Sequence, residues 1–247
     1  MTSSIQIPIN NEKKYLAIDT FGQILSIAVS KKDKFHYTEI DANMKQSELV
    51  MDMIDTQLKN TEITPAELDM VLCMKGPGSF TGLRIGYSIA KGLVLSLGIP
   101  FASIPTLDCI AYQAVLDTEN HVFSDSSLIL AVIESGKNSF YYTFFKYSSC
   151  ENENPLRLTV DSDGDFMQIS GEIGNYSEKI IITGPGSSSL YNCLPFELKR
   201  NILVNDYTGG YAKELIILAI KGKIFNNDNN SMIYSGPEYI RKTPAEQ

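Results

Sequence analysis

The sequence is poor in the side chains that bind metals or form disulfides. Its two histidines, His36 and His121, lie in unrelated segments without a paired ligand spacing. The four cysteines are far apart in the chain, so we predict neither a metal site nor a disulfide framework. Without metal ligands, and without a Gly-x-Ser-x-Gly motif around a serine, the sequence argues against a peptidase. A reducing cytoplasm is the expected location.

Basic residues are also few, and long apolar runs are missing. Lysine and arginine total 21 against 29 acidic residues, which gives a formal net charge of -8. No cluster of basic residues stands out, so we do not expect a surface that binds nucleic acid by itself. No run of about 18 apolar residues is free of charge, so no membrane-spanning helix is predicted. The 247 residues, 43% of them hydrophobic, suffice for one large domain or two modest ones.

The most distinctive segment is residues 76–86, which read Gly-Pro-Gly-Ser-Phe-Thr-Gly-Leu-Arg-Ile-Gly. Four glycines in eleven residues are typical of positive φ angles or of a backbone that approaches another group closely. The apolar run before the segment predicts a buried strand, and residues 83–97 after it have helical length. Gly82, Gly86 and Ala90 recur every fourth residue, so one face of this helix has almost no side chains. Another backbone is expected against that face.

Two interpretations of the glycine-rich segment stay open. The start of the helix could bind phosphate, with Lys75, Gly78 and Arg84 beside a nucleotide that a partner subunit completes. The segment lacks the lysine and hydroxyl ending of a Walker loop, however. Alternatively, the glycines only allow helix and sheet to touch.

A second informative helix is predicted at residues 46–59. On a helical wheel Val50, Met51, Ile54 and Leu58 form one stripe, and two further apolar residues widen it beyond half of the circumference. A helix that covers one sheet needs a narrower apolar face. We interpret the excess, with the adaptable methionines at its edge, as a protein-binding surface. The alternative is that a neighbouring helix of the same domain covers it.

From residue 15 onward the predicted order is three strands, helix, strand, helix, strand, helix, which indicates a mixed sheet with covering helices. Residues 130–136 repeat the pattern of residues 16–22: apolar strand, acidic residue, small residue, glycine. We interpret this as a duplication of one unit. The predicted parts are a flexible N-terminal extension at 1–14, a first domain at 15–125 that carries the partner-binding helices, and a smaller second α/β domain at 126–247.

Together these segments resemble the TsaB family (also called YeaZ), the bacterial partner subunit in threonylcarbamoyladenosine modification of tRNA. The resemblance rests on residues 76–86 and on three shorter motifs, Leu16 to Thr20, Gln46 to Glu48, and Pro237 with Tyr239 to Arg241. It therefore spans nearly the whole chain. Gln46 stands where the family often has a histidine, and Lys75 stands where an arginine is common.

The resemblance implies an α/β fold of the actin-like and sugar-kinase-like (ribonuclease H-like) type, duplicated, with a reduced second domain. Kinases of that superfamily hold phosphate and magnesium with acidic residues at turns, and Asp19 and Glu134 stand at such positions. An independent magnesium-dependent ATPase or phosphotransferase is therefore the alternative function. The plainer interpretation is that each carboxylate stabilises its own hairpin turn.

The resemblance further implies an accessory subunit that is not itself an enzyme. It is expected to bind and stabilise a TsaD-type catalytic paralogue as a heterodimer, with a TsaE-type ATPase assisting, and to form a homodimer when alone. It should need no cofactor of its own, with ATP and metal on partner subunits, and should contact tRNA only indirectly. The expected partner interface consists of Ser47, Val50, Met51, Ile54, Leu58, Gly82, Gly86 and Ala90.

Overall fold

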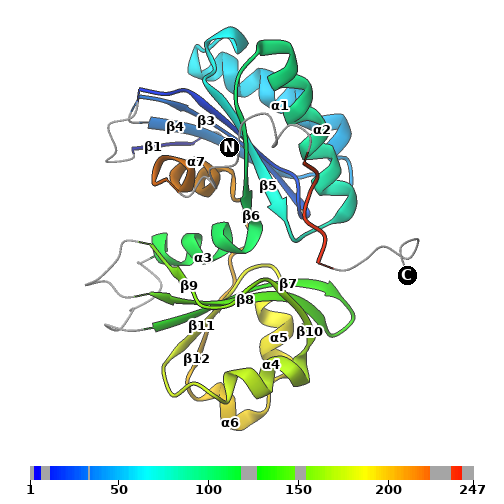
Figure 1. Ribbon diagram of the computed structural model, residues 1–247, viewed down its shortest axis with the longest axis vertical. Helices are drawn as coiled ribbons and strands as arrows, with labels where there is room; N and C mark the ends of the chain where they lie inside the picture. The colour runs from blue at the N-terminus through cyan, green and yellow to red at the C-terminus, as the bar shows by residue number, and fades with distance from the viewer. Residues whose placement is uncertain are drawn as a thin grey trace. The chain divides into compact units, whose positions relative to one another are not determined.

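A computed structural model describes residues 3–6, 12–32, 34–117, 127–147, 154–222 and 235–240. The chain forms two compact units, and neither unit is one continuous segment. Unit 1 comprises residues 1–106 and 209–238, and unit 2 comprises residues 107–208 and 239–247. Figure 1 shows the helices and strands of both.

Unit 1 is built on a six-stranded mixed sheet in the order β1, β4, β3, β2, β5, β6. Antiparallel pairing joins β1 to β4, β4 to β3 and β3 to β2, whereas β2, β5 and β6 are parallel. The strands are β1 (Ser3–Gln6), β2 (Tyr15–Asp19), β3 (Ile24–Lys31), β4 (Lys34–Asp41), β5 (Met70–Gly76) and β6 (Phe101–Pro105).

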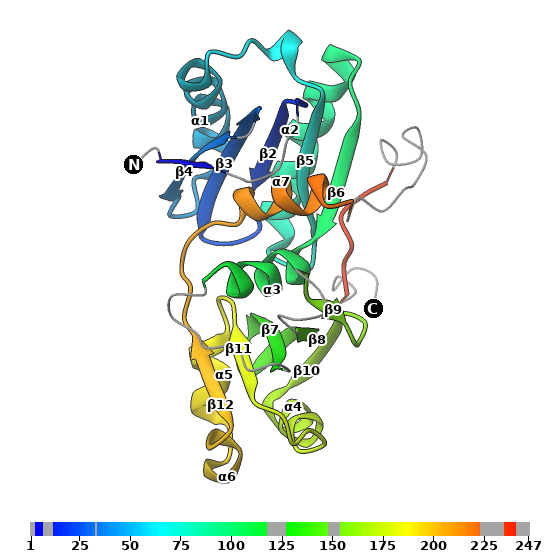
Figure 2. The ribbon, with the colours of Figure 1, turned by 90° about the vertical axis from the view of Figure 1, so that its left-hand side faces the viewer.

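Helices cover both faces of this sheet. On one face, α1 (Gln46–Thr61) packs on β3 and β4, and α2 (Phe80–Leu97) packs mainly on β5; the short helix η1 (Pro65–Glu67) precedes β5. On the other face, α7 (Ala212–Ile220) lies over β2, β3 and β5, as Figure 2 shows. Because both faces are covered, all five side chains of β2 are buried.

Unit 2 is built on a second mixed sheet in the order β10, β8, β7, β11, β12, with β9 paired to β8. Its core lies between this sheet and α4 and α5. The strands are β7 (Ser127–Gly136), β8 (Ser139–Tyr147), β9 (Leu156–Arg157), β10 (Ser162–Asp165), β11 (Ile180–Thr183) and β12 (Ile202–Asn205), and the helices are α3 (Thr106–Leu116), α4 (Phe166–Ile173), α5 (Ser187–Cys193) and α6 (Phe196–Lys199).

The two sheets share one topology, which confirms the predicted duplication. In unit 1, β2, β3 and β4 pair antiparallel, and β5 and β6 follow in parallel beside β2. In unit 2, β7, β8 and β10 pair antiparallel, and β11 and β12 follow in parallel beside β7. β7 takes the place of β2, so the two repeated segments occupy equivalent places: residues 130–136 lie in β7, and residues 16–19 end β2 with residues 20–22 in the turn after it. A second Gly-Pro-Gly-Ser, at residues 184–187, follows β11 as the first follows β5, and its leading glycine also has a positive φ. The helices of 8, 7 and 4 residues between β10 and β12, against 16 and 18 residues in α1 and α2, confirm a reduced second domain.

Two predicted boundaries are wrong. Residues 3–6 are not a flexible extension but a strand on the edge of β4. The polar sequence of this segment gave no sign of a strand. It pairs with the open edge of β4 through backbone N–H and C=O groups, which are present in any sequence. The predicted division after residue 125 also fails, because α3 belongs almost wholly to unit 2 whereas residues 209–238, with α7, belong to unit 1. No local pattern reveals such an exchange of helices.

Candidate functional site

The loop between β5 and α2 positions the start of α2. Gly76 ends β5 with a φ of +114°, a conformation that glycine adopts without strain. The Ser79 backbone N–H donates to the carbonyl oxygen of Phe21 (2.9 Å), and the Ser79 hydroxyl oxygen accepts from the Gly82 N–H (3.2 Å). This serine is therefore the N-cap of α2 and also ties the loop to the end of β2.

The glycine face of α2 packs against the chain itself. A Cβ on Gly82 would lie 2.0 Å from the carbonyl oxygen of Thr20, and one on Gly86 would lie 2.6 Å from the Thr20 hydroxyl oxygen. That hydroxyl donates to the Gly82 carbonyl (2.7 Å), and Ala90 is fully buried. The interpretation that the glycines let helix and sheet touch is confirmed. The prediction that Gly82, Gly86 and Ala90 contact a partner is wrong, because the end of β2 already occupies their face.

The residues of α1 that were predicted to contact a partner fall into a buried group and an exposed group. Val50, Ile54 and Leu58 are buried on β3 and β4, so the prediction that they contact a partner is wrong as well. Ser47 and Met51, from the same predicted interface, face outward, and Met51 is 48% exposed. The helical wheel identified an unusually wide apolar face, but it did not show which part of that face the sheet covers.

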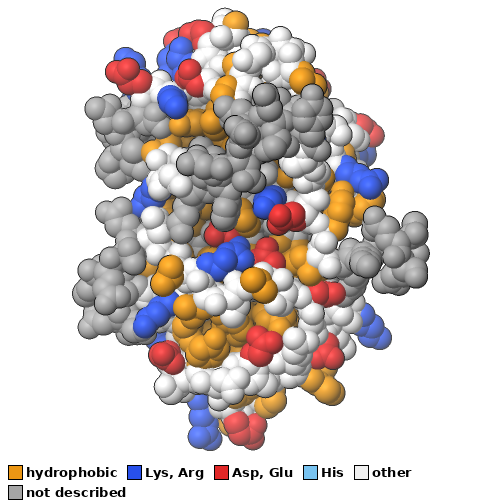
Figure 3. Space-filling view, viewed as in Figure 1, with side chains coloured by type: hydrophobic (Ala, Val, Ile, Leu, Met, Phe, Trp, Pro, Cys, Tyr) orange, Lys and Arg blue, Asp and Glu red, His pale blue; other side chains and the backbone are white. Residues whose placement is uncertain are grey.

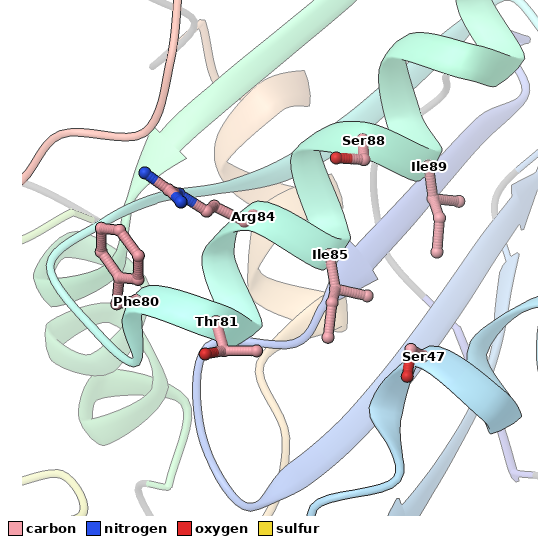
Figure 4. Close-up of a pocket in the computed structure, with 7 residues that line it drawn as sticks. All are labelled: Ser47, Phe80, Thr81, Arg84, Ile85, Ser88 and Ile89. Atoms are coloured by element: carbon pink, nitrogen blue, oxygen red, sulfur yellow. The ribbon is translucent and has the colours of Figure 1, made fainter.

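Between α1 and α2 lies an open groove of about 440 Å³ (Figure 4). Ile85 and Ile89 project from α2 on the side of Ser47, and the Arg84 guanidinium carbon lies 3.8 Å from the centre of the Phe80 ring. The residues that line the groove are Ser47, Phe80, Thr81, Arg84, Ile85, Ser88 and Ile89. An apolar floor with hydroxyl and guanidinium groups at its rim suits contact with another protein.

Sequence reasoning found only part of this groove. It named Ser47 and Arg84 but missed Ile85 and Ile89. The available signal was their spacing: Ile85 and Ile89 are four residues apart, and they follow Gly82 and Gly86 by three residues each. Residues at this spacing lie on one face of a helix.

The three residues expected beside a nucleotide do not come together in the groove. Arg84 lines it, whereas Lys75 forms an ion pair with Glu238, with 2.6 Å between the ammonium nitrogen and Oε1. Gly78 lies against Phe21, whose Cβ is 2.9 Å from the position that a Cβ on Gly78 would take. The glycine is thus explained by packing against that ring.

Asp19 is fully buried and engaged by its own unit. Its carboxylate accepts hydrogen bonds from the backbone N–H groups of Phe21 (3.3 Å) and Tyr211 (2.8 Å) and from the Ser26 hydroxyl (3.1 Å). Burial raises the pKa of Asp19 to about 6, although these hydrogen bonds act in the opposite direction. The interpretation that Asp19 stabilises its turn is confirmed. Glu134 is exposed near the end of β7 in unit 2.

A second buried carboxylate in unit 1, Glu214 on α7, was missed by sequence reasoning. Its side chain is 1% exposed, and neither carboxylate oxygen has a hydrogen-bond partner; the Lys213 ammonium lies 3.9 Å from Oε1. Burial raises the pKa of Glu214 to about 7, and the negative charges of Asp19 and Glu39 act in the same direction. No sequence pattern signals a glutamate that faces a sheet.

The described part of the chain holds neither a cluster of metal ligands nor a membrane-spanning helix. There, no three His, Cys, Asp or Glu side chains gather as metal ligands would. His121 and Cys150 lie outside the described residues. Among those same described residues, every helix is too short or too polar to cross a bilayer. On the face shown in Figure 3, basic side chains are scattered among acidic ones.

Comparison with known proteins gives consistent matches. The family model described as "TsaD: tRNA N6-adenosine threonylcarbamoyltransferase" matches residues 39–196. The chain is 40% identical over 195 residues to "tRNA threonylcarbamoyladenosine biosynthesis protein TsaB" of Buchnera aphidicola subsp. Schizaphis graminum, covering 77% of this chain and 88% of that protein. To the protein of the same name from Bacillus subtilis it is 36% identical over 136 residues, covering 54% and 56% respectively.

One solved structure shows how far the fold likeness extends. It is described as an uncharacterized protein with similarity to peptidase YEAZ from Pseudomonas aeruginosa, and it superposes with a TM-score of 0.77. The superposition covers 93% of this chain and all of that chain at 16% identity. At that identity the likeness shows the fold alone.

Proposed function

This chain belongs to the TsaB (YeaZ) family, and on that premise we propose that it is an accessory subunit of tRNA threonylcarbamoyladenosine biosynthesis that binds and stabilises a TsaD-type catalytic subunit. The names of its relatives support a role in that biosynthesis. In this proposal the chain carries no catalytic group. ATP and metal bind to partner subunits, among them a TsaE-type ATPase, and the assembly works in the cytoplasm.

The observation that carries the proposal is the outward face of α1 and α2. Ile85 and Ile89 form the floor of an open groove. Large apolar side chains stand exposed on the same two helices and just before them, with Met44 at 88%, Met51 at 48% and Leu95 at 66% exposure. Exposed apolar side chains on helices that also form an open groove are typical of a protein-binding surface.

The form of this face suits helices of a partner. Residues one helical turn apart make ridges, and two helices pack when the ridges of one enter the grooves of the other. A TsaD-type paralogue is a suitable occupant, since its family model matches this chain over residues 39–196, which include both helices. When the partner is absent, a second copy of this chain can use the same face, which gives the expected homodimer.

An indirect role toward tRNA fits the charge of the chain. Its formal net charge is -8, and binding of a nucleic-acid backbone relies on clustered lysine and arginine. In the proposed assembly another subunit therefore holds the tRNA.

The test is light scattering coupled to size-exclusion chromatography, with this chain alone and mixed with the TsaD-type protein of the same organism. We expect a mixed species at the summed mass. Ile89→Glu and Met51→Glu should each abolish it, because a charge in an apolar interface is left without a partner. Two separate peaks for the unmodified proteins at micromolar concentration would contradict the proposal.

The matched control is Met167→Glu. Met167 is 68% exposed on α4 of unit 2 and does not line the groove, so this change should leave the complex intact. Ile54→Glu is unsuitable as a binding variant, because Ile54 is 2% exposed and a glutamate there would unfold unit 1. Equal loss of binding in Met167→Glu and Ile89→Glu would show that the groove is not the interface.

A further inference from the structure

A short segment near the C-terminus, residues 235–238, lies along the loop that leads into α2. The Glu238 backbone N–H donates to the carbonyl oxygen of Lys75 (2.8 Å), and the Glu238 carboxylate pairs with the Lys75 ammonium (2.6 Å). Farther along α2, the Lys91 ammonium donates to the carbonyl oxygen of Ser235. Figure 1 shows this red segment running beside α2. We call residues 235–238 the latch.

The latch is seated on Gly76. A Cβ at this position would lie 2.4 Å from the carbonyl oxygen of Glu238, closer than real side chains allow. The positive φ of +114° at Gly76 is a second reason for glycine there. The first glycine of the segment thus leaves room for the backbone of the latch, a role distinct from that of Gly82 and Gly86, which make room for Thr20.

The latch and the end of β2 hold the loop from two sides. Lys75 and Gly76 contact the latch, and three residues later the N–H of Ser79 is bound to the carbonyl of Phe21. The helix then starts at once with Phe80, Thr81 and Arg84, all of which line the groove. Any shift of the loop must therefore move the rim of the groove.

We propose that Lys75 and Glu238 are positioning residues for partner binding: the latch fixes the loop, and through it the groove-lining start of α2, without lining the groove itself. This inference rests on the proposed function. In this proposal residues 235–238 affect partner binding by fixing the loop, whereas the residues of the groove contact the partner directly. It also explains why Lys75 points to Glu238 and not into the groove.

The first experiment measures the affinity of the TsaD-type subunit for variants of the full chain by isothermal titration calorimetry. Lys75→Ala and Glu238→Ala should each weaken binding about fivefold, since a partly exposed ion pair is lost and fewer molecules hold the competent loop. The double change Lys75→Glu with Glu238→Lys should restore most of the affinity. Glu62→Ala, which removes the exposed Lys31–Glu62 pair of the same unit, is the matched control and should bind as the unmodified chain does.

The second experiment needs no partner. Hydrogen exchange of the isolated chain should be faster in Glu238→Ala at the amides of Ser79, Gly82 and Leu83 and unchanged in β2 and β3. A uniform rise across unit 1 would mean that Glu238 only stabilises the unit, and would overturn the proposal.

The two experiments separate the two claims. If the unmodified chain does not bind the TsaD-type subunit, the proposed function fails and the hydrogen exchange alone decides whether the latch fixes the loop. If the unmodified chain binds, and both single variants bind equally well with unchanged exchange, the latch is refuted while the accessory role stands.

Discussion

Replacing Gly82 by alanine tests the contact between α2 and the end of β2. In an ordinary helix this change stabilises, because alanine has the higher helix propensity by about 1 kcal/mol. Here the new Cβ would lie 2.0 Å from the carbonyl oxygen of Thr20 and 3.1 Å from its carbonyl carbon. Both atoms are backbone, so no side chain can turn aside. The helix itself has to move away from β2.

The magnitude follows from three terms. Overpacking of a rigid contact costs about 1–3 kcal/mol or more. Lifting the helix weakens the 2.7 Å hydrogen bond from the Thr20 hydroxyl to the Gly82 carbonyl, which contributes about 1 kcal/mol. Set against the gain in propensity, the net destabilisation is about 1–3 kcal/mol.

Gly92 on the same helix provides the control. No atom lies within 4 Å of the position that its Cβ would take, and the residue is exposed. Gly92→Ala should therefore raise the free energy of unfolding by about 1 kcal/mol. Urea unfolding followed by circular dichroism compares the two variants. If Gly82→Ala proved as stable as Gly92→Ala, the account of the glycine face as a backbone contact would be refuted.

Two further predictions concern the buried carboxylates of unit 1. The pKa values of Asp19 (about 6) and Glu214 (about 7) are raised in the folded state. The folded chain therefore keeps protons on these two carboxyl groups that the unfolded chain releases near pH 4. The two groups contribute their full stabilisation below that pH, and this contribution is lost as the pH rises through about 7. Glu214→Gln should therefore reduce the fall in unfolding free energy between pH 5 and pH 8 by about 1–3 kcal/mol in urea titrations, and an unchanged slope would contradict this. The isolated chain should show no magnesium-dependent ATP turnover above background, because its own N–H and hydroxyl groups engage the Asp19 carboxylate; turnover that disappears in Asp19→Asn would instead support an independent ATPase.

Local patterns in the sequence were enough to predict the central strands, the duplication and the importance of residues 76–86. Strand alternation, helical spacing and glycine density are properties of neighbouring residues, and they carry over into the structure. The same patterns do not tell which side of a helix meets its sheet. Val50 and Met51 are adjacent on one predicted stripe, yet the first is buried and the second half exposed.

The features that sequence analysis missed depend on contacts between distant segments. The strand at residues 3–6, the exchange of α3 and α7 between units, and the seat of Glu238 on Gly76 all join parts of the chain that share no local signal. The buried carboxylate of Glu214 belongs to the same class, because its burial follows from the position of α7 on the sheet. Such contacts become visible only when the sheets are assembled.

The exchange of helices also constrains how the protein is made. The sheet of unit 1 is complete in the chain by residue 105, but α7, which covers one of its faces, begins only at residue 212. During synthesis that face, with the carboxylate of Asp19 in it, stays uncovered until residues 107–208 of unit 2 and then α7 have been translated. Unit 1 is therefore completed late in synthesis, and a fragment cut near residue 125 would lack the helix that covers one face of its sheet.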